Sequence, residues 1–132
     1  MHPSRLVAAA SAWAAGVLYV LVGVGVLDIG RAVDPGAQDL LAFGIAAGAA
    51  QVLVGAVLLG AKGRAPLLLV VGFETLVVLL YVAVASVRIP AYEEWGLTIK
   101  ALEIVTLVAT LALATHLHPV RTGAERHVGH GL

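Results

Sequence analysis

The chain has 132 residues, of which 61% are hydrophobic and only 12% are charged, and its mean hydropathy is +1.01. Soluble domains carry about 25% charged residues, so this chain has too few polar side chains to cover a surface that faces water. Its formal net charge of zero provides no basic field for nucleic acid, and the absence of cysteine excludes disulfides, thiolate nucleophiles and cysteine-ligated metals. Composition therefore predicts a single membrane-embedded domain over 1–132.

Four apolar runs each come close to the roughly 20 residues that a helix needs to cross the hydrocarbon core of a bilayer. Because backbone polar groups find no water in lipid, each run is expected to be helical. The predicted helices cover 6–27, 40–60, 66–87 and 97–117, and a short cytoplasmic tail follows over 118–132. Short connections favour packing between sequence neighbours, so the predicted fold is an all-α integral membrane protein, an antiparallel four-transmembrane-helix bundle.

The first run also has features of a cleaved signal peptide. A basic N-terminus precedes Ala10-Ser11-Ala12, which matches a small-residue cleavage site. Cleavage there would leave an apolar stretch of only a few residues, whereas the run continues unbroken to Leu27. A retained first helix is therefore the favoured interpretation.

Turn and capping residues mark the later helix boundaries. Asp34-Pro35-Gly36 is typical of a turn, and Asp39 is a candidate N-cap for the second helix. The boundaries further along are marked by Gly60 and Gly63 after the second helix, Pro66 in the first turn of the third, Pro90 after the third, Glu93 and Glu94 near the start of the fourth, and Pro119 after the fourth.

Basic residues in the connections predict the orientation of the chain. One side collects Arg5, Lys62, Arg64, Arg121 and Arg126, and the other has Arg31 and Arg88. Since positive residues favour the cytoplasmic side, both termini and the central loop are predicted to be cytoplasmic, in a multi-pass protein of the cell (inner or plasma) membrane. Tyr92 and Trp95 fit an aromatic belt at the outer interface.

Small residues form a stripe on each of the first two helices. The first helix carries Gly16 and Gly23, and the second carries Gly44, Gly48 and Gly55 on the face that also holds Gln51. Such stripes let helix backbones approach closely in lipid, where no hydrophobic force drives association. Packing of the two helices within one chain is the favoured interpretation, and an interface between copies of the chain is the alternative.

Two glutamates lie inside the apolar runs, where a carboxylate costs roughly 2.5–3.5 kcal/mol on insertion scales. At 1.5 Å of rise per residue, Glu74 lies about 12 Å from the cytoplasmic boundary. Gln51 and Thr110 fall at similar depths, about 13 Å and 10 Å from the same side. These three residues are therefore expected to form an inner polar layer.

The second glutamate, Glu103, lies about 9 Å below the outer boundary. Lys100 is one turn away on the same helix face, close enough to pair with it or to extend towards the interface. Tyr81 falls at roughly the same level as Glu103, and Tyr19 lies only slightly deeper. We therefore expect a second polar layer around Glu103, separate from the first.

The two layers have a structural and a functional interpretation. In the structural one, Lys100 pairs with Glu103, and a protonated Glu74 hydrogen-bonds Gln51 or Thr110, which holds the helices in register. In the functional one, the row of titratable and hydroxyl groups binds a proton or a cation. The functional interpretation is favoured for Glu74 and the structural one for Glu103.

No motif in the chain supports metal binding or catalysis. The four histidines near the C-terminus match no recognised metal site, and a solvated tail is the favoured interpretation for His116, His118, His127 and His130. No serine has a histidine at matching depth, and the chain lacks a phosphate loop, a dinucleotide fingerprint and an HExxH motif. We expect no cofactor and no enzyme, with an intramembrane lipid enzyme that uses Glu74 or Glu103 as the minor alternative.

Two functions of different classes remain. The first is a non-catalytic accessory, assembly or scaffold component that binds other membrane proteins or lipid. The second is a small transporter or channel in which Glu74 binds a proton or cation, helped by Gln51, Thr110 and Tyr81. The expected partners are the lipid bilayer and either another membrane protein or further copies of the chain, and nucleic acid is not expected. The missing extramembrane domain favours the first function slightly.

Overall fold

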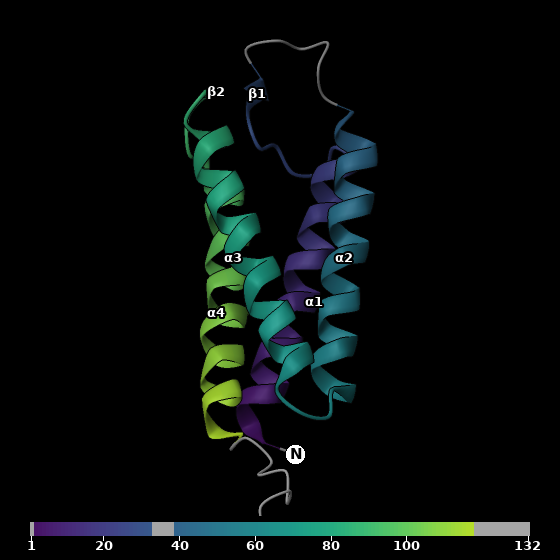
Figure 1. The fold of residues 1–132 in the computed structure, drawn as a ribbon. Coiled ribbons are helices and arrows are strands. Elements are labelled where there is room, and N and C mark those ends of the chain that lie inside the picture. Colours follow the sequence, from purple (N-terminus) through teal and green to yellow (C-terminus); the bar gives the residue numbers. More distant parts are fainter. Residues whose placement is uncertain (1, 33–38, 118–132) are drawn as a thin grey trace, which may run out of the picture.

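The computed structural model describes residues 2–32 and 39–117 (Figure 1). This part of the chain forms four helices and two short strands, namely α1 (Pro3–Gly23), β1 (Arg31–Ala32), α2 (Leu40–Gly60), α3 (Ala65–Ala85), β2 (Arg88–Ile89) and α4 (Glu94–His116). Each helix has 21 to 23 residues and is long and apolar enough to cross a membrane. The prediction of a helical protein with four candidate spans is confirmed.

Two of the predicted boundary signals act as expected. The Asp39 carboxylate accepts a hydrogen bond from the Ala42 N–H at 3.0 Å and so caps the N-terminus of α2. Pro66 lies in the first turn of α3, where its missing N–H breaks no helical hydrogen bond. The predicted turn at 34–36, the boundary at Pro119 and the tail 118–132 lie outside the described residues.

Helix α1 ends four residues before the predicted boundary at residue 27. The Val24 N–H donates to the carbonyl of Val20, and the chain then turns at Gly25, whose φ of +78° is a conformation that glycine adopts readily. Residues 24–27 therefore remain apolar without being helical. Helix α4 begins at Glu94 instead of 97, with Glu93 in the N-cap position, so its polar first turn is helical as well.

The helices do not pack evenly on one another. Helix α1 packs extensively on α2 and also on α4, and α3 packs on α4. Although a short connection joins α2 to α3, these two helices scarcely touch, so the expectation that sequence neighbours pack together is wrong for this pair. Figure 1 shows that they lie close at their connection and separate towards the end that carries the strands.

Glycines allow α1 and α2 to approach closely. A Cβ atom added to Gly44 would lie only 2.5 Å from Gly23 Cα, and one added to Gly48 would lie 2.9 Å from the carbonyl oxygen of Gly16. Gly55 packs against the ring of Trp13, whose Nε1–H donates to the Val52 carbonyl at 3.2 Å. All five glycines of the two predicted stripes therefore lie in the contact between α1 and α2.

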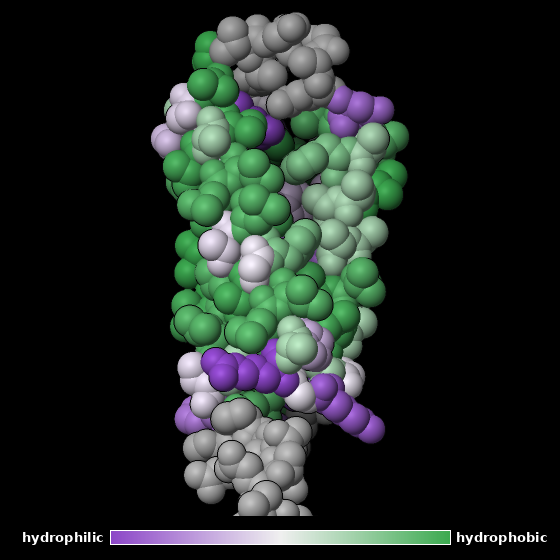
Figure 2. Space-filling model, viewed as in Figure 1, coloured by the Kyte–Doolittle hydropathy of each residue, from purple (hydrophilic) through white to green (hydrophobic). Residues whose placement is uncertain are grey.

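The surface between the two ends is apolar. Figure 2 shows hydrophobic residues over most of the flank, with hydrophilic residues near the ends. Large apolar side chains such as Leu69 (75% exposed) and Leu53 (65% exposed) point outward, while small residues such as Ala8 and Ala12 are fully buried. A continuous exposed apolar belt of this kind indicates a membrane-embedded surface, and with four candidate spans it indicates a multi-pass membrane protein.

The two strands join connections that are far apart in the sequence. Strands β1 and β2 pair antiparallel, with Arg31 opposite Ile89 and Ala32 opposite Arg88. This pairing links the α1–α2 connection to the α3–α4 connection at the end where α2 and α3 diverge (Figure 1). Two-residue strands carry no alternating pattern that a sequence could reveal, so they were not predicted.

Candidate functional site: a buried polar network beside an open cleft

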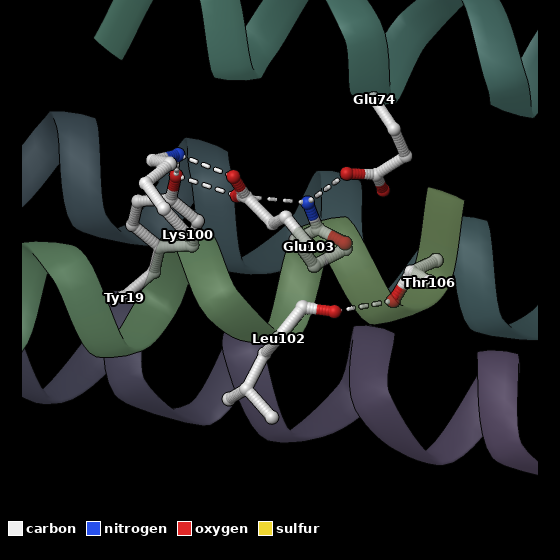
Figure 3. Close-up of polar contacts among 7 residues, drawn as sticks. Tyr19, Glu74, Lys100, Leu102, Glu103 and Thr106 are labelled. Carbon is white, nitrogen blue, oxygen red and sulfur yellow. Dashed lines mark hydrogen bonds and ion pairs between the residues drawn. The ribbon is translucent and has the colours of Figure 1, made fainter. Parts of the chain in front are cut away.

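Five polar residues form one buried network that includes a side chain from every helix (Figure 3). All five are at most 7% exposed. They are Tyr19 of α1, Gln51 of α2, Glu74 of α3, and Lys100 and Glu103 of α4. Each of these side chains has a hydrogen bond to at least one other member, so the network connects the four helices in the middle of the protein.

Glu103 is at the centre of the network. Its Oε1 atom accepts hydrogen bonds from the Tyr19 hydroxyl at 2.7 Å and from Gln51 Nε2 at 3.2 Å, and its Oε2 atom pairs with Lys100 Nζ. Lys100 also donates to the Tyr19 hydroxyl at 2.6 Å. The expected Lys100–Glu103 pair is therefore present. With three donors, the Glu103 carboxylate is well compensated for its burial.

Glu74 has much weaker compensation. Its Oε2 atom accepts one long hydrogen bond from Gln51 Nε2, at 3.4 Å, and its fully buried Oε1 atom has no partner. The Oε1 atom of Gln51 also lacks one. Glu74 is thus the ionisable member of the network with the weakest hydrogen bonding.

The expectation of two separate polar layers is wrong, because Gln51 donates to both glutamates. The earlier start of α4 explains the error. Glu103 lies nine residues into α4 instead of six, which places it roughly 13 Å from the N-terminal end of that helix. Glu74 lies nine residues into α3 from the opposite end, so the two carboxyls are nearly level and one glutamine reaches both.

Two predicted site residues lie outside this network, and one member was not predicted. Thr110 donates to the Thr106 carbonyl of its own helix at 2.7 Å and makes no hydrogen bond to Glu74. The Tyr81 hydroxyl has no partner, although Lys100 Nζ lies 5.2 Å from the centre of its ring. Tyr19 is the member that the sequence does not predict, because nothing in the sequence tells which way a lone tyrosine points.

The network contains two carboxyls and one ammonium group. With both carboxyls ionised it would hold one unbalanced negative charge, and burying such a charge is costly. Because Glu103 already has three donors, a proton or a monovalent cation would restore neutrality best at Glu74. The arrangement is therefore able to bind one positive charge at that residue.

A cleft of about 610 Å³ lies between the diverging parts of α2 and α3. Its walls are mainly apolar and include Phe43, Ala46 and Ala50 of α2 and Phe73, Val77 and Leu80 of α3. Figure 2 shows the corresponding hollow in the half of the molecule near the strands. Lys100 and Tyr19 form part of its inner wall, whereas Glu74, Gln51 and Glu103 do not reach it.

A second polar group lies in the cleft wall near the strands. Arg88 Nη1 lies 3.7 Å from Glu93 Oε1, which is too long for a hydrogen bond, and the two side chains are 9% and 7% exposed. Gly96 makes room beside them, because a Cβ there would lie 2.6 Å from Glu93 Oε1 and 2.7 Å from the Tyr81 hydroxyl. We call Tyr81, Arg88 and Glu93 the outer polar group, because Arg88 and Glu93 lie beyond the ends of α3 and α4.

The described residues contain no cluster of three His, Cys, Asp or Glu side chains suited to a metal ion. Of the four predicted tail histidines, only His116 lies within the described residues, where its ring centre is 5.9 Å from that of His2. No protein-family model, curated protein or solved structure matches the chain. The fold itself defines a class: a helical protein with four candidate membrane spans.

Proposed function

We propose that the protein is a non-catalytic accessory or scaffold component of the cell membrane that holds a lipid molecule in the cleft between α2 and α3. The proposal includes an antiparallel four-helix bundle with both termini in the cytoplasm, for which the distribution of arginine and lysine is the support. The single observation that carries the lipid assignment is the apolar cleft, which divides two helices of membrane-spanning length.

The size and walls of the cleft favour a lipid-like occupant. Its volume of about 610 Å³ lies within the roughly 300–1,000 Å³ of typical small-molecule sites. Phe43 and Phe73 offer apolar contact from opposite helices, which suits a hydrocarbon chain. The hollow in the flank (Figure 2) would face the bilayer, so a lipid could enter sideways without crossing water.

The buried network supports a scaffold more than a catalyst. Its hydrogen bonds tie Tyr19, Gln51 and Glu103 into one arrangement, which fixes the rotation of their helices. Glu74 and Glu103 do not line the cleft, so neither carboxyl is placed to act as an acid or base on a molecule bound there.

Filling the cleft tests this function. Ala46 of α2 lines the cleft, and Ala49 on the same helix is exposed outside it, so A46F and A49F form a matched pair. We expect native mass spectrometry of protein extracted with its membrane to detect bound lipid in the wild type and A49F, and much less in A46F. Equal lipid retention by both variants and the wild type would contradict the proposal, as would a wild type that retains none.

A second candidate function is proton- or cation-coupled transport through Glu74. The observation that favours it is the unpartnered Oε1 atom of this fully buried carboxyl, in a network with one carboxyl more than its single ammonium group. In proteoliposomes, a cation- or proton-dependent flux that E74Q abolishes without lowering stability would support transport. The absence of any flux in the wild type would exclude it and leave the lipid-binding function unaffected. E94Q, at an exposed position, is the matched control.

A further inference from the structure

We propose that the outer polar group recognises the headgroup of a zwitterionic lipid with a primary ammonium, phosphatidylethanolamine, with Glu93 binding the ammonium and Arg88 and Tyr81 the phosphate. This inference rests on the proposed function, in which the cleft holds a lipid. It adds the chemical class of that lipid and the residues that select it.

The first support is a set of buried polar atoms without partners. The Tyr81 hydroxyl, Arg88 Nε and both carboxylate oxygens of Glu93 are buried and make no hydrogen bond. All three side chains line the cleft. Within the described residues, the other such atoms belong to Gln51 and Glu74, which do not line it. Since buried polar groups are normally satisfied, this cluster has the properties of a ligand site.

The second support is the balance of charge. Arg88 and Glu93 form an ion pair at 3.7 Å without a hydrogen bond between them, and Arg88 Nη1 donates to the Ile29 carbonyl. Arg88 Nε and both Glu93 oxygens keep their hydrogen-bonding capacity, so the pair offers a ligand one group of each charge. A fatty-acid carboxylate could bind Arg88 but would face the negative charge of Glu93, and a purely cationic amphiphile would face Arg88. Lys100 is already held by Glu103 and Tyr19. Asp39 also lines the cleft, but its side chain is exposed and already caps α2 through the Ala42 N–H. A headgroup with one charge of each sign is the best match.

The third support is the position of the group along the protein. Arg88 lies in β2, just after α3 ends, and Glu93 immediately precedes α4. Both therefore lie at the ends of candidate spans, where lipid headgroups meet the hydrocarbon core. The apolar walls, with Leu80 and Val77 of α3, continue from this point towards the middle of the helix. A lipid bound with its headgroup at Glu93 can thus place an acyl chain along the cleft.

Hydrogen bonding distinguishes the primary ammonium from choline. An ammonium group has three N–H donors for the two unpartnered oxygens of Glu93, whereas a trimethylated nitrogen has none. Hydrogen bonds to charged groups contribute about 1.5–3 kcal/mol, which corresponds to a preference of roughly 10- to 150-fold. Phosphatidylethanolamine should therefore be retained over phosphatidylcholine with the same acyl chains by at least about tenfold.

The test is a competition between lipids of identical chains and different headgroups. Purified full-length protein is exchanged into mixed micelles with equal amounts of dioleoyl phosphatidylethanolamine, phosphatidylcholine and phosphatidylglycerol, and bound lipid is counted by native mass spectrometry. We expect phosphatidylethanolamine to dominate in the wild type and in the exposed control E94Q. In E93Q the preference over phosphatidylcholine should fall to near unity, and Y81F should weaken both lipids alike because it removes a phosphate donor.

Each outcome separates the headgroup inference from the proposed function. Equal retention of all three lipids by the wild type, with loss of all three in A46F, overturns the headgroup inference and leaves the lipid-binding function intact. Preferential retention of phosphatidylglycerol overturns it in favour of an anionic ligand. Absence of any bound lipid in the wild type overturns the proposed function itself. If E93Q fails to fold, the retention of phosphatidylethanolamine over phosphatidylcholine by the wild type still tests the headgroup inference.

Discussion

The close contact between α1 and α2 makes a quantitative prediction for the substitution of Gly44 by alanine. The new Cβ would lie 2.5 Å from both Gly23 Cα and the Tyr19 carbonyl oxygen, whereas ordinary contact begins at 3.4 Å. Both neighbours are backbone atoms and cannot rotate away, so the two helices must separate by about 1 Å. Overpacking of this kind costs about 1–3 kcal/mol. Because Tyr19 carries a hydrogen bond to Glu103, displacement of α1 would strain the buried network as well.

The assay is unfolding of the purified protein by sodium dodecyl sulfate in mixed micelles, followed by tryptophan fluorescence. Trp13 packs against Gly55 between α1 and α2, so a W95F background makes the signal specific for this contact. We expect G44A to lower the free energy of unfolding by about 1–3 kcal/mol. The matched control is G72A on α3, where an added Cβ meets nothing within 4 Å and should cost nothing, since alanine is the better helix former.

Equal stability of G44A and G72A would refute the reasoning. It would mean that the α1–α2 contact tolerates a methyl group, so that the glycine stripes are not required for close packing. A loss in both variants would point instead to a general effect of replacing glycine in these helices.

The remaining predictions concern the polar network and the membrane orientation. K100M removes the ammonium partner of Glu103 and should destabilise the protein by about 3–5 kcal/mol, while K62M at an exposed position should leave detergent-induced unfolding nearly unchanged. Q51L removes the donor shared by both glutamates and should cost about 1–3 kcal/mol in the same assay, so an unchanged midpoint would argue against the network. The chain has no cysteine, so single cysteines report topology directly: K62C should react with an impermeant maleimide only from the cytoplasmic side, and E94C only from the outer side. Labelling of both residues from the same side would contradict the predicted orientation.

Much of the architecture could be predicted because a bilayer restricts the length and the secondary structure of a segment that crosses it. A span needs about 20 apolar residues in helical form, so the four runs indicated four helices, and the capping role of Asp39 followed from its side chain. The ends of the helices followed less directly from hydropathy. The apolar run continues past Gly23, yet α1 ends there, since a turn at Gly25 depends on backbone geometry and not on hydropathy.

The candidate site was predictable only in its parts. Burial cost identified Glu74 and Glu103 as unusual, and helical spacing identified Lys100 as a partner for Glu103. The connection of both carboxyls through Gln51 was not predictable, because small errors in helix start and tilt shift depths by several ångströms. Of the outer polar group, Tyr81 was among the predicted site residues, whereas Arg88 and Glu93 were not. Its members come from α3, β2 and the start of α4, and only the fold brings them together.

The sequence by itself determined the chemical setting of this protein: four apolar helices, glycine stripes on the first two of them, and two carboxyls inside apolar runs. These follow from local composition and from the 3.6-residue period of a helix. The tertiary structure decided which helices touch. In the folded protein, α2 and α3 diverge and leave a cleft between them. Glu74 and Glu103 lie at similar depths, so that Gln51 donates a hydrogen bond to both. Helix rotation, tilt and divergence depend on side chains from all four helices at once, so no single segment of the sequence specifies them.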